Sequence, residues 1–176
     1  FLYFVMNIAG EAIWEFGDKF FASQNLEDAN FTTYYPIAEE DIEKLEEDYS
    51  VVLEPQYYSN IETGDVTARV FKKTDDINLY SVTVGEDAEK NDEIIISEGY
   101  AVFNEIAVGD QITVGDKDYT VTGFFYFFDY LYMLENEGDS YKNVTTFFLA
   151  YVTDEEYENI GGENCQYLVR YEKENE

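Results

Sequence analysis

The sequence predicts an α+β protein, and three observations carry this prediction. Helix-like and strand-like patterns alternate near both ends of the 176-residue chain, so that each end gives one β-α-β succession. Between them lies a long stretch of short apolar or alternating runs separated by polar turns, which is typical of strands. Hydrophobic residues make up 45% of the chain, enough for a core to form although the formal net charge is −29.

The first β-α-β succession lies in the N-terminal third. Residues 31–35 are aromatic or β-branched and predict a strand, which Pro36 ends. Residues 38–49 predict an acidic amphipathic helix with Ile42 and Leu45 on its apolar face. Residues 51–58 then predict the second strand of this unit.

The middle of the chain predicts strands. Three of them are expected at residues 67–72, 79–84 and 93–97, and Ser97 is placed to cap a short helix after the third. The clearest pattern follows, because polar and apolar residues alternate over residues 111–114 and again over 119–123. Gly115 with its neighbour Asp116 supplies the turn between them, so this stretch predicts a β-hairpin.

The C-terminal end gives the second β-α-β succession. Residues 145–152 predict a strand, and residues 166–171 predict the last one. Between them, Thr153 precedes three acids in the order of a capping box, so a short helix is expected over residues 154–160.

Two β-α-β units that flank a strand-rich insert suggest a ferredoxin-like layer made from the two chain ends. We therefore expect residues 29–66 and 144–176 to form this layer and residues 67–143 to form an inserted β-rich subdomain. Residues 1–28 carry apolar residues at roughly helical spacing and predict an N-terminal helix. Their apolar opening is too short to span a bilayer, which takes roughly 20 apolar residues, and we expect it to continue from a transmembrane segment.

Composition excludes several kinds of chemistry. There are 39 acidic and 10 basic residues, so the chain repels nucleic acids, and none is expected as a partner. Histidine is absent and Cys165 is the single cysteine, which excludes Ser-His-Asp and Cys-His nucleophile systems and Cys/His zinc sites. The acidic clusters do not follow the spacing of a calcium loop. We therefore expect no catalytic residue, no metal ligand and no cofactor.

An aromatic run over residues 124–133 is the candidate partner-contact surface. It has two interpretations: a strand buried on both faces, or an aromatic patch that contacts a ligand, a partner subunit or a membrane surface. Its tyrosines favour a half-exposed setting, because a buried hydroxyl needs a hydrogen-bond partner. The candidate contact residues are Phe124, Phe125, Tyr126, Phe127, Phe128, Tyr130 and Tyr132.

Three segments in the middle of the chain resemble the MacB-like periplasmic core domain of FtsX-family ABC transporter permeases. Residues 93–101 (EIIISEGYA) resemble the strand of that family that ends in a Ser-Glu step. Residues 107–114 (AVGDQITV) resemble its Val-Gly-Asp hairpin strand, and residues 117–124 (KDYTVTGF) resemble its Tyr-x-Val-x-Gly return strand. The resemblance covers residues 93–125. The segment after the Ser-Glu step, residues 100–104, departs from the Arg- or Leu-rich pattern of the family.

This resemblance implies a non-catalytic domain on the outer face of the bacterial cytoplasmic membrane, between two transmembrane helices of a permease. The implied partners are those helices and a separate cytoplasmic ABC ATPase, in a dimeric transporter. A peptide such as a cationic antimicrobial peptide, a lipoprotein or a cell-wall hydrolase would be its substrate or partner, and the sequence leaves these alternatives open. The competing hypothesis is a secreted or surface-anchored acidic module that binds cations or basic peptides.

Overall fold

The computed structural model describes residues 24–126, 145–162 and 164–172, and within them it shows a mixed α+β fold with a large sheet and few helices. The predicted fold class is confirmed. The sheet has nine strands in the order β1-β9-β2-β3-β8-β5-β7-β4, with β6 paired to β7 beside this path. The strands are β1 (Ala29–Thr32), β2 (Val51–Thr63), β3 (Val66–Phe71), β4 (Ser81–Gly85), β5 (Glu93–Ser97), β6 (Gln111–Val114), β7 (Lys117–Tyr126), β8 (Phe147–Tyr151) and β9 (Asn164–Tyr171).

Both predicted β-α-β units are present. The first consists of β1, helix α2 (Glu39–Tyr49) and β2, and β9 lies between its two strands. The second consists of β8, helix α4 (Asp154–Ile160) and β9, with β2 and β3 between its strands. We call β1, α2, β9 and the half of β2 that pairs with β9 the end layer. Strands β3 to β8, with helices α3 (Glu98–Phe103) and α4, are called the main sheet. The division into the predicted domain ranges stays a prediction.

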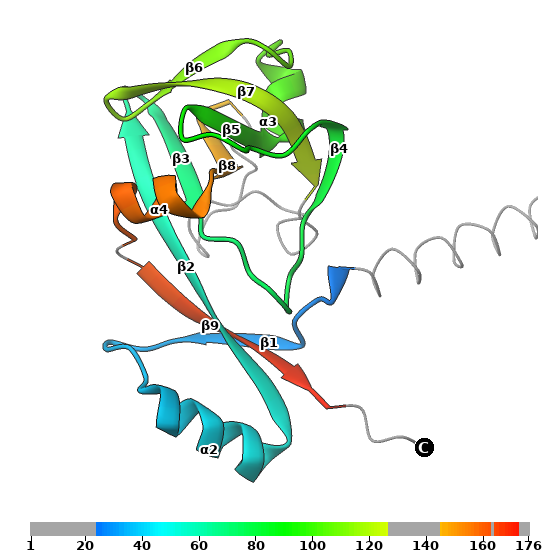
Figure 1. The fold of residues 1–176 in the computed structure, drawn as a ribbon, viewed down its shortest axis with the longest axis vertical. Helices are drawn as coiled ribbons and strands as arrows, with labels where there is room; N and C mark the ends of the chain where they lie inside the picture. Colours follow the sequence, from blue (N-terminus) through cyan, green and yellow to red (C-terminus); the bar gives the residue numbers. More distant parts are fainter. Residues whose placement is uncertain (1–23, 127–144, 163, 173–176) are drawn as a thin grey trace, which may run out of the picture.

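Strand β2 connects the two parts, as Figure 1 shows. Its first half, Val51 to Tyr58, pairs antiparallel with β9, and its second half, Tyr58 to Thr63, pairs with β3. The sequence predicts this strand only as far as residue 58. Pro55 is tolerated because β9 is its sole pairing partner among the described residues, so its missing N–H need not serve a second ladder.

The first predicted strand is wrong at its boundaries. Strand β1 ends at Thr32, and the side chains of Tyr34 and Tyr35 beyond it are exposed. The Thr33 hydroxyl donates a hydrogen bond to the Tyr35 carbonyl oxygen at 2.6 Å. Such a local bond competes with the strand ladder, which explains the early end.

The middle of the chain confirms the predicted hairpin. Strands β6 and β7 pair antiparallel from Gln111↔Thr120 to Val114↔Lys117, and Gly115 adopts a positive φ of 65° at the turn. Helix α3 (Glu98–Phe103) begins after Ser97 as predicted. The Ser97 hydroxyl makes no capping bond, however, and instead accepts the Leu149 amide at 3.3 Å.

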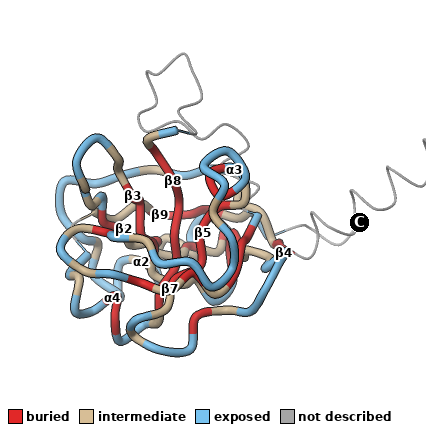
Figure 2. The backbone as a smooth tube through the Cα atoms, turned by 90° about the horizontal axis from the view of Figure 1, so that it is seen from above, coloured by how far each residue is buried: buried red, intermediate tan, exposed pale blue. Residues whose placement is uncertain are grey.

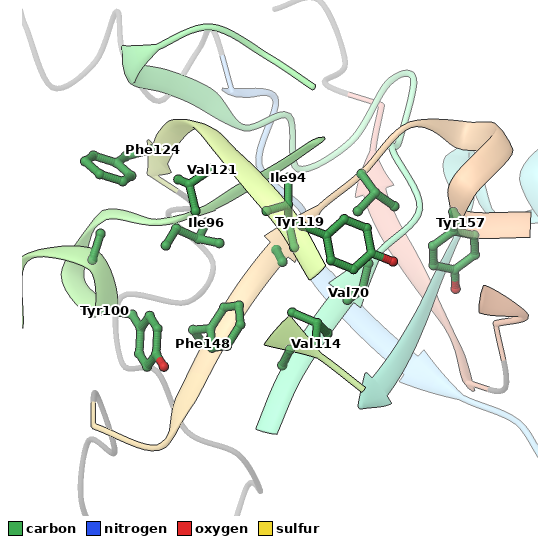
Figure 3. Packing of buried hydrophobic residues seen from close by; sticks show 14 residues of the cluster. Val70, Ile94, Ile96, Tyr100, Val114, Tyr119, Val121, Phe124, Phe148 and Tyr157 are labelled. Carbon is green, nitrogen blue, oxygen red and sulfur yellow. The ribbon is translucent and has the colours of Figure 1, made fainter. Parts of the chain in front are cut away.

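Two apolar clusters cover the two faces of the main sheet, and buried residues gather along β5, β7 and β8 in Figure 2. The larger cluster, drawn in Figure 3, packs the rings of Tyr100 and Phe148 in a stack with centroids 4.4 Å apart. It also contains Ile94, Ile96 and Val121 from the parallel pair β5 and β7. This core fixes the main sheet on which the remaining features are placed.

Candidate functional site

The aromatic run is divided by the structure at Tyr126. Phe124 and Phe125 lie at the end of β7 and are 9% and 1% exposed, on opposite faces of the sheet. At these two positions the run is a strand buried on both faces, so these rings form core instead of a contact surface. Tyr126 is 45% exposed. Phe127, Phe128, Tyr130 and Tyr132 lie outside the described residues, and the partner-contact surface stays a prediction.

The second candidate site is the junction of β1 and β9, the first and last strands that the structure describes. Strands β1 and β9 are antiparallel neighbours, with Ala29 opposite Val169. The Asp28 amide donates to the Val169 carbonyl oxygen at 2.8 Å, and the Tyr171 amide donates to the Asp28 carboxylate at 2.8 Å. The first and last described strands therefore lie side by side, as Figure 1 shows.

Apolar contacts hold this junction on one face. Val51, Leu53 and Val169 form its buried cluster, against which Ile42 and Leu45 of α2 pack. The rings of Phe31 and Tyr167 stack across β1 and β9 with centroids 5.3 Å apart. The Tyr167 hydroxyl, which is buried, accepts the Ile37 amide at 2.7 Å and so fixes the path from β1 to α2. Strands β1, β2 and β9 and helix α2 are thereby held together.

The outer surface of the end layer is acidic. Helix α2 carries three acids in its first turn and no basic residue in its last turn, and none of its residues is buried. Acids in the first turn interact favourably with the helix dipole, so this charge also stabilises the helix. Among the described residues, no group of three or more Asp, Glu or Cys side chains is arranged to hold a metal ion. The surface can attract basic groups by its field, and a specific cation site has no support within these residues.

A buried carboxylate ties α4 to the hairpin of the main sheet. Glu156 is 4% exposed, and its Oε1 atom accepts from the Tyr119 hydroxyl at 2.6 Å and from Lys117 Nζ at 2.7 Å. Asn159 Nδ2 donates to the other oxygen at 3.3 Å. Burial by itself raises the pKa of Glu156, but these three hydrogen bonds outweigh it and hold the pKa below its ordinary value.

Sequence reasoning assigns Glu156 only to the capping pattern after Thr153. Nothing in the local pattern reveals its contact with residues 37 to 39 positions earlier in the chain. The same carboxylate raises the pKa of Tyr119, an effect second to burial. Every oxygen of Glu156 is occupied by a structural partner, so the group serves to hold α4 in place.

The three segments that carry the family resemblance form one continuous unit. Residues 93–101 fold as β5 and the start of α3, and residues 117–124 fold as β7 beside β5. Residues 107–114 lead into β6, where the Gly109 amide donates to the Val121 carbonyl oxygen at 2.8 Å. The sequence order of the motifs thus becomes a spatial neighbourhood.

None of the described helices is both long and apolar enough to cross a membrane. No protein-family model and no curated protein matches the chain. Among solved structures, the chain is similar to the extracellular domain of the noncanonic ABC-type transporter YknZ from Gram-positive bacteria, at 19% identity. The match covers 83% of this chain and 75% of that one, with a TM-score of 0.41. At so low a TM-score the similarity carries no argument.

Proposed function

We propose that this chain is the extracytoplasmic domain of an ABC transporter permease of the FtsX/MacB type, without catalytic activity of its own. The observation that carries the proposal is the pairing of β1 with β9, which places the first and the last described strands next to each other. This arrangement suits a domain inserted between two neighbouring transmembrane helices, because both helices end at the same membrane surface. The motif resemblance within β5, β6 and β7 supports the same family from an independent part of the chain.

The proposed role is to couple motion of the transmembrane helices, driven by a cytoplasmic ATPase, to a substrate or partner outside the cell. The end layer would receive the motion because it contains β1 and β9, the first and last described strands. The main sheet would move as one body, because its interior is packed and cannot deform continuously. The permease would act as a dimer, and its partner would be a peptide, a lipoprotein or a cell-wall hydrolase.

The charge of the chain favours a cationic peptide among these partners. The exposed acids of α2 lie on the end layer, and the whole chain carries a formal charge of −29. Long-range attraction raises the rate at which a basic peptide meets such a surface, and it weakens with salt. We expect Glu40, Glu43 and Glu47, changed together to Gln, to alter the peptide sensitivity of cells more than Glu62, Glu89 and Glu155 changed in the same way. Equal sensitivity of the two triple variants would argue against a role of α2.

A labelling experiment on membrane topology tests the proposal. In a full-length, otherwise cysteine-free protein with Cys165→Ser, a cysteine placed at the exposed position Glu40 should react with a membrane-impermeant maleimide in intact cells. A cysteine in the associated ATPase serves as the control and should react only after lysis. The protein should also remain in the membrane after carbonate extraction. Release into the medium, or attachment to the cell wall, would favour the acidic binding module instead.

A further inference from the structure

The loop of residues 72–80 joins β3 to β4 by a long detour. In Figure 1 it descends from the main sheet to the point where the described chain begins, and then returns to β4. Two of its residues, Ile77 and Asn78, are fully buried, which is unusual for a connecting loop. The contacts of this loop explain why it is held there.

Glu54 of β2 is the first residue that holds the loop in place, and we call it the first anchor. Its carboxylate accepts three successive backbone amides, from Asp75 at 2.6 Å, from Asp76 at 3.2 Å and from Ile77 at 2.6 Å. Hydrogen bonds from amides to an ionised carboxylate are about twice as strong as neutral ones. One side chain of the end layer therefore fixes the backbone of the loop over residues 75–77.

Asn25 is the second anchor of the loop. It belongs to residues 24–28, which lead into β1 and which we call the entering chain. Its carbonyl oxygen accepts the Asn78 amide at 3.1 Å, and its side-chain amide donates to the Asp76 carbonyl oxygen. Its side-chain oxygen accepts from Arg170 of β9. Asn25 and Asn78 both have positive φ angles, 50° and 54°, a conformation that Asn adopts more readily than most residues.

The neighbours of Asn25 add two more connections. The Leu79 amide donates to the Gln24 carbonyl oxygen at 2.8 Å, and Gln24 Nε2 donates to the Ser81 hydroxyl at 2.5 Å. In the other direction, the Glu27 amide donates to Asn78 Oδ1 at 2.9 Å. The entering chain thus contacts the loop from Asp76 onward and reaches the first residue of β4.

Asp87 is the third anchor, and it holds the two ends of the loop together. One of its oxygens accepts both Lys73 Nζ and the Tyr80 hydroxyl, each at 2.8 Å, so the two arms of the loop meet at one carboxylate. The Tyr80 ring stacks on Tyr151 of β8 with centroids 4.2 Å apart, which fixes the upper end to the core of the main sheet. Burial, followed by the bond to Asp87, raises the pKa of Tyr80, so this hydroxyl stays a donor.

We propose that residues 72–80 are a strap that transmits the position of the entering chain, at Gln24 to Asp28, to strand β4 and the main sheet. A displacement of the entry point would move the strap with it, because the contacts on Asn25 and Glu54 leave no loose linker between the two. That such displacements arise from transmembrane helices rests on the proposed function. The strap itself rests on the contacts alone.

Hydrogen exchange followed by mass spectrometry on the full-length, membrane-embedded protein tests the strap without nucleotide. Asn25→Gly keeps the backbone conformation accessible and removes both side-chain bonds, and Glu54→Gln removes the charge on the carboxylate. In each variant we expect exchange about tenfold faster at residues 77–79 and in β4, because local opening of the strap costs less free energy. Glu62→Gln, an exposed glutamate at the other end of β2, is the matched control and should change neither segment.

The decisive result is whether the effect reaches β4. Faster exchange confined to residues 24–28 in Asn25→Gly, with β4 unchanged in both variants, would overturn the strap. Faster exchange throughout β5 and β8 would equally overturn it, because it would report general destabilisation. The maleimide topology of the protein is independent of these results, so a failure of the strap and a failure of the proposed function are distinguishable.

Discussion

The end layer and the main sheet are stabilised in different ways. The main sheet has two apolar clusters, with Ile94, Ile96 and Leu149 fully buried. The end layer has one small cluster whose three buried members, Val51, Leu53 and Val169, are all 8–9% exposed. Polar contacts to Glu54, Asn25 and Asp28 supplement it. The main sheet is thus stabilised chiefly by a large apolar core, whereas the end layer combines a small apolar cluster with the β2–β9 ladder and a few side-chain hydrogen bonds.

The end layer and the main sheet should differ in how easily they open. Regions with few buried apolar contacts open at lower free energy than regions with a packed core. We therefore expect the end layer to open at lower free energy than the main sheet.

Truncation of a buried core side chain is expected to lower the free energy of unfolding most. It tests whether the main sheet and the end layer differ in packing. Ile96→Ala should lower the free energy of unfolding by about 4 kcal/mol, because it removes buried methylene groups and leaves a cavity. Leu45→Ala, at a half-buried position of α2, should cost about 1 kcal/mol, because less apolar surface is lost. Urea unfolding of both variants measures the difference. Equal losses of unfolding free energy would mean that the end layer is packed as tightly as the main sheet.

Two glycines, Gly123 and Gly109, test how closely neighbouring backbones approach each other in the main sheet. A Cβ atom at Gly123 would lie 2.5 Å from the Glu86 carbonyl oxygen and 2.8 Å from that of Val84, both of them backbone atoms. Gly123→Ala should therefore cost about 3 kcal/mol, from overpacking between β7 and β4. Gly109→Ala is the control, since a Cβ there meets nothing within 4 Å and only its φ of 98° opposes the change. Its cost should be about 1 kcal/mol by thermal or urea unfolding; a similar cost for both would refute the close-approach explanation.

The buried carboxylate gives the next largest effect. Glu156→Gln should cost about 2 kcal/mol near pH 7, because Lys117 loses its charged partner. The pKa of Glu156 is lower in the folded protein than its ordinary value of 4.5, so its contribution is present above that pH and is lost as the pH falls through the folded pKa. Unfolding measured from pH 7 down to below 4 should show a weaker acid dependence in Glu156→Gln. The exposed neighbour Glu155→Gln is the control, and an identical acid profile in all three proteins would contradict the assignment.

Helix caps give the smallest expected effect and compare the two parts directly. Thr153 Oγ1 accepts the Glu156 amide at 3.2 Å at the start of α4, whereas Ala38 gives α2 no side-chain cap. Thr153→Ala should cost about 1 kcal/mol, and Ala38→Ser should stabilise by up to about 1 kcal/mol. Thr153→Ser, which keeps a hydroxyl, is the control for the first change. No gain from Ala38→Ser would show that the α2 N-terminus is already satisfied.

Local patterns determined the elements that depend on neighbouring residues. Alternation around Gly115 predicts the hairpin of β6 and β7, the spacing of Ile42 and Leu45 predicts α2, and Thr153 predicts the start of α4. These predictions succeed because turns, amphipathic faces and caps are decided within a few residues. Composition likewise excluded histidine-dependent chemistry without reference to any fold.

Tertiary structure decided what depends on distant partners. The extension of β2 to Thr63 follows from its pairing with β3, and the burial of Phe124 and Phe125 follows from the sheet having a cluster on each face. Glu156 meets Tyr119, and Asn25 meets Arg170, across separations of 37 and 145 residues. No periodicity encodes such contacts, because they form only when the assembled sheet brings these side chains together.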